Sequence, residues 1–170
     1  MTDAIYEAFL QEQWRAGREL ADHSDLLDLD VIDHDRCVAR FFCKGLVRQP
    51  DGQIVEATDF VVGIWFPSDY LRTVSPHEIV TWFRPTNVWH PNLLPPACCL
   101  GPIAPGTELV DLLYQCYEII TYGNWAPHDA LNREAAQWAR NQHRYPFPLD
   151  RRPLRRRVLD LQVKEEGNDR

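Results

Sequence analysis

The sequence lacks the features of a membrane-bound or secreted protein. It contains no apolar run of about 18 residues, the length that a membrane-spanning helix requires. Its first residues, Thr2 to Glu7, do not have the pattern of a signal peptide. The five cysteines are odd in number and follow no disulfide-framework spacing, which is typical of a reducing compartment. We therefore expect a cytoplasmic protein with no membrane partner.

Lysine is also scarce, whereas arginine is plentiful. The net charge is −7 and the pI is about 5.3, a balance that argues against a general nucleic-acid binder. Lysine occurs only at Lys44 and Lys164, a bias that a GC-rich genome explains. Apolar residues are plentiful, because 45% of the 170 residues are hydrophobic. That is enough for one well-buried domain, and the chain is too short for two of ordinary size.

Three segments have the apolar periodicity of helices. Residues 3–21 form an amphipathic pattern that Asp3 can cap, with an apolar stripe near Ile5, Phe9, Ala16 and Leu20 and with Tyr6, Leu10 and Trp14 beside it. In the second segment, Thr107 is the expected cap of a buried helix whose apolar residues recur at helical spacing: Leu109, Leu112, Leu113, Cys116, Ile119 and Ile120. The third helix is expected over 131–141, burying Leu131, Ala135 and Trp138.

Between the first two helices the pattern predicts a four-stranded antiparallel meander, so the fold class is α+β. The strongest turn signal is Gln49-Pro50-Asp51-Gly52. The expected strands are 26–32, 36–47, 54–66 and 78–83. We expect residues 1–145 to form the domain and residues 146–170 a Pro/Arg-rich extension. Its arginines are either solvated or available to an acidic partner: Arg151, Arg152, Arg155, Arg156 and Arg157.

The stretch from Trp89 to Gly101 carries the residues best suited to chemistry. Pro91 has a fixed φ and biases His90 toward extended conformations, so His90 and Asn92 lie on stiff backbone a few residues before a cysteine. A thiolate accepts and releases acyl groups. A nearby carboxamide can donate to the oxyanion that forms at a thioester carbonyl. This combination favours acyl transfer from a thioester.

Two adjacent cysteines, Cys98 and Cys99, compete for the role of nucleophile. Neighbouring side chains of an extended segment point in opposite directions, so one should face the interior when the other faces outward. Two core thiols are the plain alternative. A zinc site made of Cys98, Cys99 and His90 is weaker, because adjacent cysteines do not match the usual Cys-x-x-Cys spacing. The remaining cysteines, Cys37, Cys43 and Cys116, lie in apolar patterns and are expected to be inert core thiols.

Three motifs in order resemble the ubiquitin-conjugating enzyme family. His90-Pro91-Asn92 followed by Cys99-Leu100 is similar to the family's His-Pro-Asn tripeptide and catalytic Cys-Leu, at a spacing one residue tighter than usual. Upstream, Phe66-Pro67-Ser68-Asp69-Tyr70 matches the family's Phe-Pro-x-Asp-Tyr strand end. Downstream, residues 127–132 (Pro-His-Asp-Ala-Leu-Asn) resemble the Pro-Asp-Asp-Pro-Leu loop. The resemblance covers roughly residues 5–142 and implies the fold of that family.

The resemblance implies a role for each site residue. Cys99, which precedes Leu100, would be the thioester-forming catalytic cysteine. Asn92 would either stabilise the oxyanion or brace the neighbouring backbone. Asp129 would orient the attacking lysine and accept its proton, or merely cap the helix expected near Leu131; His128 is an alternative base. His90 is expected to be architectural rather than a proton shuttle.

The resemblance also implies partners and no cofactor or metal. An activating enzyme would consume ATP and deliver a ubiquitin-like modifier. The segment Tyr70–Pro76 and the short loop from Cys99 to Pro105 depart from the family surface that meets RING-type ligases. This divergent form looks like bacterial homologues, which are often encoded beside an activating enzyme, a modifier and a JAB-type peptidase, in some cases in antiviral defence operons.

Two other interpretations remain open at this point. A non-catalytic variant of the same fold would serve as a protein-interaction module, although such variants lose the cysteine. An unrelated α+β domain would use Cys98 and Cys99 only as structural residues. A thioester adduct at Cys99 would separate the conjugating-enzyme interpretation from both of these.

Overall fold

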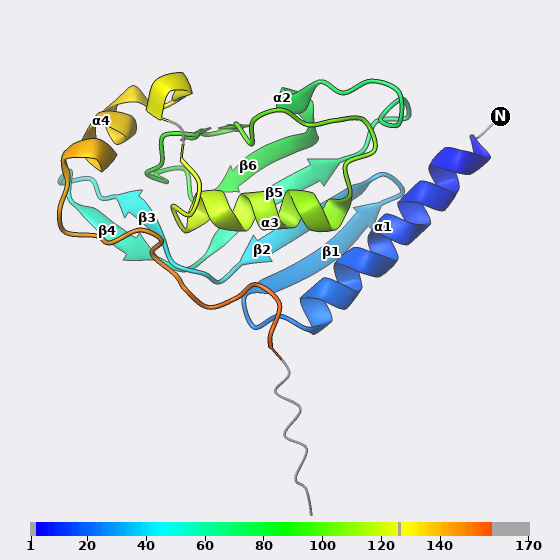
Figure 1. The fold of residues 1–170 in the computed structure, drawn as a ribbon, viewed down its shortest axis with the longest axis horizontal. Coiled ribbons are helices and arrows are strands. Elements are labelled where there is room, and N and C mark those ends of the chain that lie inside the picture. The colour runs from blue at the N-terminus through cyan, green and yellow to red at the C-terminus, as the bar shows by residue number, and fades with distance from the viewer. Residues whose placement is uncertain (1–2, 126, 158–170) are drawn as a thin grey trace, which may run out of the picture.

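The computed structural model describes residues 3–125 and 127–157, and these form an α+β protein with an N-terminal helix and an antiparallel sheet (Figure 1). The helical elements are α1 (Ala4–Asp22), α2 (Pro76–Ile79), α3 (Leu109–Ile120), a 3₁₀ turn η1 (Pro127–Asp129) and α4 (Arg133–Asn141). The strands are β1 (Leu27–Asp33), β2 (Arg36–Phe41), β3 (Gly45–Arg48), β4 (Ile54–Ala57), β5 (Phe60–Trp65), β6 (Val80–Arg84), β7 (Leu93–Leu94) and β8 (Ala97–Cys98). No helix in the described part of the chain is both long and apolar enough to cross a membrane.

The strands form a six-stranded sheet of order β1-β2-β5-β6-β8-β7 and a separate two-stranded sheet, β3-β4. All the pairs are antiparallel, with registers such as Leu27 opposite Phe41 and Cys37 opposite Ile64. The expected strands 36–47 and 54–66 are therefore wrong as single strands, because each divides between the two sheets. The chain leaves the large sheet at residues 42–44, where the Lys44 N–H donates to Asp150 Oδ2 at 3.0 Å. The expected strand 78–83 begins instead with α2.

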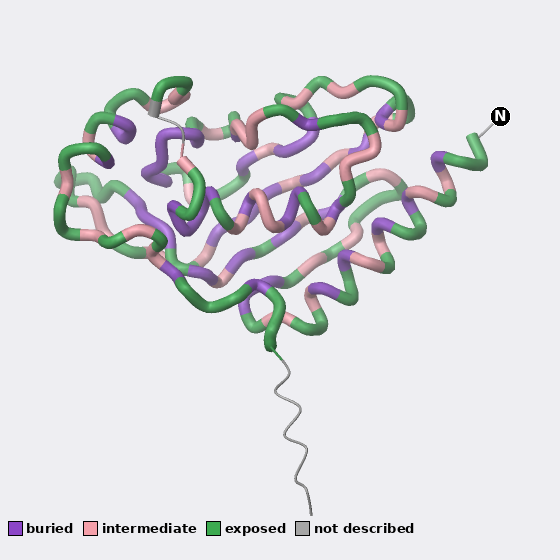
Figure 2. Tube along the Cα trace, viewed as in Figure 1, coloured by how far each residue is buried: buried purple, intermediate pink, exposed green. Residues whose placement is uncertain are grey.

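Helices α1 and α3 cover one face of the large sheet, with α1 running along the β1 edge (Figure 1). Figure 2 shows buried residues on the strands of this sheet and on the two helices, α1 and α3. The six apolar residues predicted for α3 are all buried, as expected. On α1 the prediction is wrong for Ile5, which is 74% exposed. The helix buries Leu20 of the expected stripe and Tyr6 and Leu10 beside it, and it also buries Gln13 and Gly17.

A single buried glutamine joins the two helices. The Gln13 side chain is 4% exposed, and its Oε1 accepts the Leu109 N–H at 2.7 Å. It thereby satisfies one of the backbone donors that a helix start leaves unpaired. The predicted cap Thr107 is wrong, because its Oγ1 donates to the Ala104 carbonyl and Glu108 occupies the N-cap position. Asp3 does cap α1, as predicted, accepting the Ile5 N–H.

A smaller apolar cluster lies between the β3–β4 hairpin and α4. The predicted turn is present, with the Gly52 N–H donating to the Gln49 carbonyl and Gly52 at φ 87°. Helix α4 starts two residues later than predicted and buries Ala135, while Leu131 and Trp138 are only half-buried. The fully or nearly buried members of this cluster are Leu46, Trp89, Tyr122, Ala135 and Ala139.

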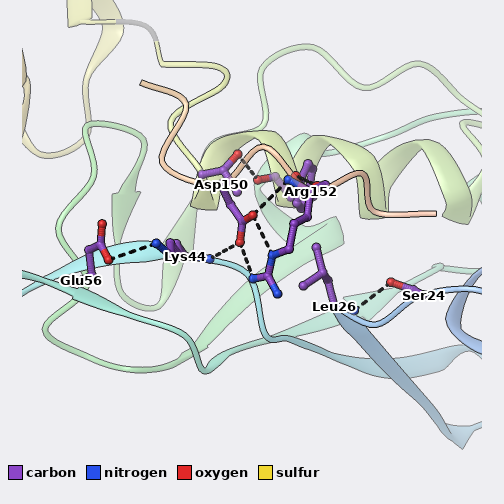
Figure 3. Close-up of polar contacts among 8 residues, drawn as sticks. Ser24, Leu26, Lys44, Glu56, Asp150 and Arg152 are labelled. Atoms are coloured by element: carbon purple, nitrogen blue, oxygen red, sulfur yellow. Dashed lines mark hydrogen bonds and ion pairs between the residues drawn. The ribbon is translucent and has the colours of Figure 1, made fainter. Parts of the chain in front are cut away.

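Residues 145–157 run across the body of the protein without regular structure, as the prolines predict. Their anchor is Asp150, which is 5% exposed and accepts from the Lys44 backbone and from Arg152 (Figure 3). Leu154 joins the main core. Several arginines of this segment pair inside the chain rather than with solvent alone: Arg152 with Asp150, Arg155 with Glu19 and Arg156 with Asp25.

Candidate active site

The site begins at a short hairpin on the end of the large sheet. Strands β7 and β8 pair Leu93 with Cys98 and Leu94 with Ala97, and Pro95-Pro96 forms the turn between them. The hairpin joins β6, because Thr81 pairs with Ala97 and the Trp82 N–H donates to the Pro96 carbonyl at 2.9 Å. Leu93 and Cys98 are both buried. Cys99 therefore follows a strand whose position is fixed from both sides.

Asn92 binds the backbone of Cys99 at two points. The Cys99 N–H donates to the Asn92 carbonyl at 2.9 Å, and Asn92 Nδ2 donates to the Cys99 carbonyl at 3.2 Å. The Asn92 N–H in turn donates to His90 Nδ1 at 2.9 Å. Asn92 is only 6% exposed. Of its two expected roles, these contacts fit bracing of the backbone.

His90 is buried and architectural in its contacts. It is 1% exposed, and burial lowers the pKa of its imidazole to about 3. The ring is therefore neutral at physiological pH, with the proton on Nε2, because Nδ1 accepts from Asn92. Nε2 meets no partner in hydrogen-bonding geometry among the described residues. The nearby Asn124 backbone raises the pKa of the imidazole, but by less than burial lowers it. This placement agrees with the expected architectural role.

Tyr122 supports the same turn, a role that no sequence pattern indicates. Its hydroxyl donates to the Trp89 carbonyl, and its ring centroid lies 4.4 Å from that of His90. Tyr122 adopts φ 60°, a left-handed conformation that is rare for a residue other than glycine, asparagine or aspartate. The position is held by burial and by stacking on Phe147.

The cysteines fall into two environments. Cys98 is 4% exposed, and burial raises its pKa to about 12. Burial likewise raises the pKa values of Cys37 and Cys43 to about 12 and raises that of Cys116. Cys99 alone is half-buried rather than buried. Of the adjacent pair, Cys98 is thus the buried member and Cys99 the partly exposed one, as the alternation of an extended segment predicts.

Residues 127–129 form η1, and the side chains of His128 and Asp129 are exposed. They line a polar hollow of about 530 Å³ with residues of α4, among them Arg133, Gln137 and Arg140. Cys99 is not among the residues that line this hollow.

The start of α4 is anchored to the His-Pro-Asn turn. The N-cap of α4 is Asn132, whose Oδ1 accepts the Ala135 N–H at 3.0 Å, so the alternative that Asp129 caps this helix is wrong. The Asn132 N–H donates to the Pro91 carbonyl at 2.9 Å. The preference of asparagine for N-cap positions could have identified it from sequence.

The Phe66–Tyr70 motif holds the loop that follows Cys99. Tyr70 is fully buried, and its hydroxyl donates to the Thr107 carbonyl at 2.8 Å. The Gly106 N–H donates back to the Tyr70 carbonyl at 3.2 Å, where Gly106 has φ 76°. The two ends of the segment are also packed together, since the Phe66 and Tyr70 ring centroids lie 4.7 Å apart.

Within the described ranges, no group of three or more His, Cys, Asp or Glu side chains is arranged to hold a metal ion. The zinc site considered for His90, Cys98 and Cys99 is therefore wrong. Comparison with protein-family models and with curated proteins gives no match to this chain. What the geometry provides is one partly exposed cysteine, Cys99, whose backbone is hydrogen-bonded by Asn92.

Proposed function

We propose that this protein carries a ubiquitin-like protein as a thioester on Cys99 and transfers it to a lysine amine of a target. The fold proposed with this activity is that of ubiquitin-conjugating enzymes. The observation that carries the proposal is the double contact between Asn92 and the backbone of Cys99, at 2.9 and 3.2 Å. It fixes the one half-buried cysteine beside the turn that the sequence resemblance associates with catalysis.

The chemistry consists of two exchanges at one carbonyl carbon. The Cys99 thiolate attacks the incoming thioester, and the donor's sulfur leaves as a thiolate. A neutral lysine amine then attacks the new thioester and loses a proton, and the Cys99 sulfur leaves as the amide forms. Neither step requires a metal or an organic cofactor. ATP would be consumed by the activating enzyme that supplies the first thioester.

Asp129 is the proposed group for orienting the amine. A lysine amine has a pKa near 10.4 in solution, so at neutral pH it must lose its extra proton before it attacks. A carboxylate beside the thioester would position the amine and accept the proton released. Two findings support this role: Asp129 is exposed, and α4 is capped by Asn132 instead. His128, exposed in the same turn, is the second candidate base.

The proposed partners are an activating enzyme and a ubiquitin-like modifier, with a JAB-type peptidase in the same pathway. The proposed setting is a bacterial cell and, within it, antiviral defence. A RING-type ligase is not proposed, because the segment 71–76 and the loop after Cys99 differ from the surface that such ligases contact in the resembling family.

The test is acyl loading of the full chain. The protein is incubated with a short glycine-terminated peptide activated as a mercaptoethanesulfonate thioester, and its intact mass is measured without reductant. We expect one peptide adduct, removed by added thiol, in the wild type and in Cys98→Ala. We expect no adduct in Cys99→Ala. An adduct that persists in Cys99→Ala and disappears in Cys98→Ala would move the nucleophile to Cys98.

A second candidate function is that of a non-catalytic interaction module. It is favoured by the polar hollow at η1 and α4, which is lined by His128 and Asp129 but not by Cys99. This candidate predicts no thiol-sensitive adduct on either Cys98 or Cys99. The same loading experiment therefore separates the two functions.

A further inference from the structure

A hollow of about 360 Å³ lies between the β3–β4 hairpin and α4, and Cys99 is not among its lining residues. Its size falls within the range of small-ligand sites. Three aromatic rings form its walls. Trp89 is 7% exposed, Trp138 and Tyr145 are half-buried, and the Trp138 centroid lies 6.3 Å from that of Trp89 and 6.1 Å from that of Tyr145.

The walls of this aromatic hollow are fixed by hydrogen bonds. The Tyr145 hydroxyl donates to the Ile54 carbonyl at 2.8 Å, which joins the segment after α4 to strand β4. The Gln142 side chain accepts the Tyr145 N–H at 2.7 Å and donates to the Tyr145 carbonyl at 2.9 Å. A site that is already ordered loses little conformational freedom when a ligand binds.

The rim of the hollow carries one uncompensated positive charge. Arg48 pairs with Glu134 at 2.9 Å and lies over the Trp89 ring at 5.0 Å. Arg144 lies over the Tyr145 ring at 5.2 Å, and it has no ion pair with any residue in the described ranges. A guanidinium group thus already lies over the Trp89 ring and another over the Tyr145 ring, two of the three rings that could attract a cation. The hollow is suited to a guest with a single negative charge.

We infer that the aromatic hollow binds a peptide segment of a partner protein in which an aromatic side chain stands next to a carboxylate. The side chain would pack among Trp89, Trp138 and Tyr145, where ring contacts add to apolar burial. The carboxylate would pair with the planar guanidinium of Arg144. A nucleotide is disfavoured, because its phosphates carry more negative charge than this rim neutralises and the whole chain already has a net charge of −7.

The inference does not depend on the activity proposed for Cys99. Trp89 reaches the hollow from the segment just before His90, and its backbone is held by Leu46 and Tyr122. The aromatic hollow and the thiol therefore use opposite ends of one rigid segment, and each is testable alone.

The test is a titration of the full chain with N-acetylphenylalanine, followed by NMR of the tryptophan indole N–H signals, with Trp138→Phe used to assign the Trp138 signal. The matched ligand is N-acetylphenylalanine amide, which keeps the ring and removes the charge. We expect saturable shifts of the Trp89 and Trp138 signals with the acid. Affinity should fall about fivefold for the amide, as for the loss of a rim ion pair.

Arg144→Gln should weaken binding of the acid by the same factor and leave binding of the amide unchanged. Arg144 is exposed, so this substitution leaves the fold intact. The matched control is Arg140→Gln, another exposed arginine without an ion pair in the described chain, which should have no effect. Equal affinities for acid and amide, an equal effect of Arg140→Gln, the absence of saturable shifts, or tighter binding of adenosine monophosphate would overturn the inference.

Discussion

At the scale of single residues, the candidate site depends on contacts that act on backbone. Asn92 accepts a hydrogen bond from the Cys99 N–H and donates one to the Cys99 carbonyl. The neutral imidazole of His90 accepts the Asn92 N–H. Neither side chain is exposed. The contacts that position Cys99, the proposed nucleophile, are thereby separate from the exposed carboxylate of Asp129, which does not cap α4.

The first prediction at this scale concerns Asp129. Asp129→Ala should load the peptide thioester at the wild-type rate but transfer it to free lysine about 10²-fold more slowly, at the low end of general-base effects. Loading and discharge are measured by intact mass over time. Asp111→Ala, which removes an exposed carboxylate on α3, should change neither rate. Equal discharge by wild type and Asp129→Ala would remove Asp129 from the reaction.

The second prediction concerns His90 and pH. Its pKa is about 3 in the folded protein, against 6.5 as the ordinary value. Below pH 6.5 the unfolded chain binds a proton that the folded chain does not, so stability is lost as the pH falls. The loss of stability should reach about 2 kcal/mol between pH 7 and pH 5.

Urea unfolding at the two pH values measures this loss. His90→Gln should be less stable at neutral pH but should lose about 2 kcal/mol less on acidification than the wild type. His143→Gln, at an exposed histidine, should keep the wild-type pH dependence. A wild-type slope in His90→Gln would contradict the buried neutral imidazole.

At the scale of elements, the packing of α1 on α3 uses a polar residue inside an apolar interface. Gln13 satisfies the Leu109 N–H at the start of α3, where Glu108 makes no side-chain cap. Helix periodicity predicted the buried face of α3 correctly. It could not predict Gln13, because a glutamine on a helix face has no sequence signal for a partner 96 residues away.

We predict that Gln13→Ala lowers the free energy of unfolding by about 1–3 kcal/mol, since a buried backbone donor loses its acceptor. Chemical denaturation of the variant and the wild type measures the difference. Gln11→Ala, which changes an exposed glutamine on the same helix, should stay within about 0.5 kcal/mol of the wild type. Equal stabilities for the two variants would mean that water replaces Gln13.

At the scale of the whole molecule, residues 145–157 tie distant parts of the chain together. Asp150 joins the crossing between the two sheets to this segment (Figure 3), and the Arg156 N–H donates to the His23 carbonyl at the end of α1. These links explain why the strand pattern was only partly predictable. Local apolar runs indicated two long strands, but a carboxylate more than a hundred residues away receives the Lys44 N–H between β2 and β3.

The candidate site was predictable to a similar extent. The alternation of Cys98 and Cys99 follows from extended geometry, and asparagine at position 132 carries an N-cap preference. The left-handed conformation of Tyr122 follows from neither. It depends on a pocket made by His90 and Phe147, which only tertiary structure brings together.

The prediction at this scale concerns Asp150. Burial alone raises the pKa of its carboxyl group, but hydrogen bonds from Arg152 and the Lys44 backbone outweigh burial and hold it at about 2. Its stabilising effect is present above pH 3.8 and is lost as the pH falls toward 2. Asp150→Asn should lower the free energy of unfolding at pH 7 by about 1–3 kcal/mol.

Denaturant unfolding at pH 7 tests this prediction against Arg151→Gln, which alters an exposed arginine of the same segment and should be neutral. If Asp150→Asn were as stable as Arg151→Gln, the segment would not be anchored through this carboxylate.

Discharge of the loaded protein tests whether Cys99 carries an acyl group and passes it to an amine. The peptide adduct is formed, excess thioester is removed, free lysine is added, and intact mass and peptide mapping follow the acyl group. We expect an adduct on Cys99 that converts to acyl-lysine faster than it hydrolyses. An adduct on another cysteine, or loss by hydrolysis at a rate that lysine does not change, would contradict it.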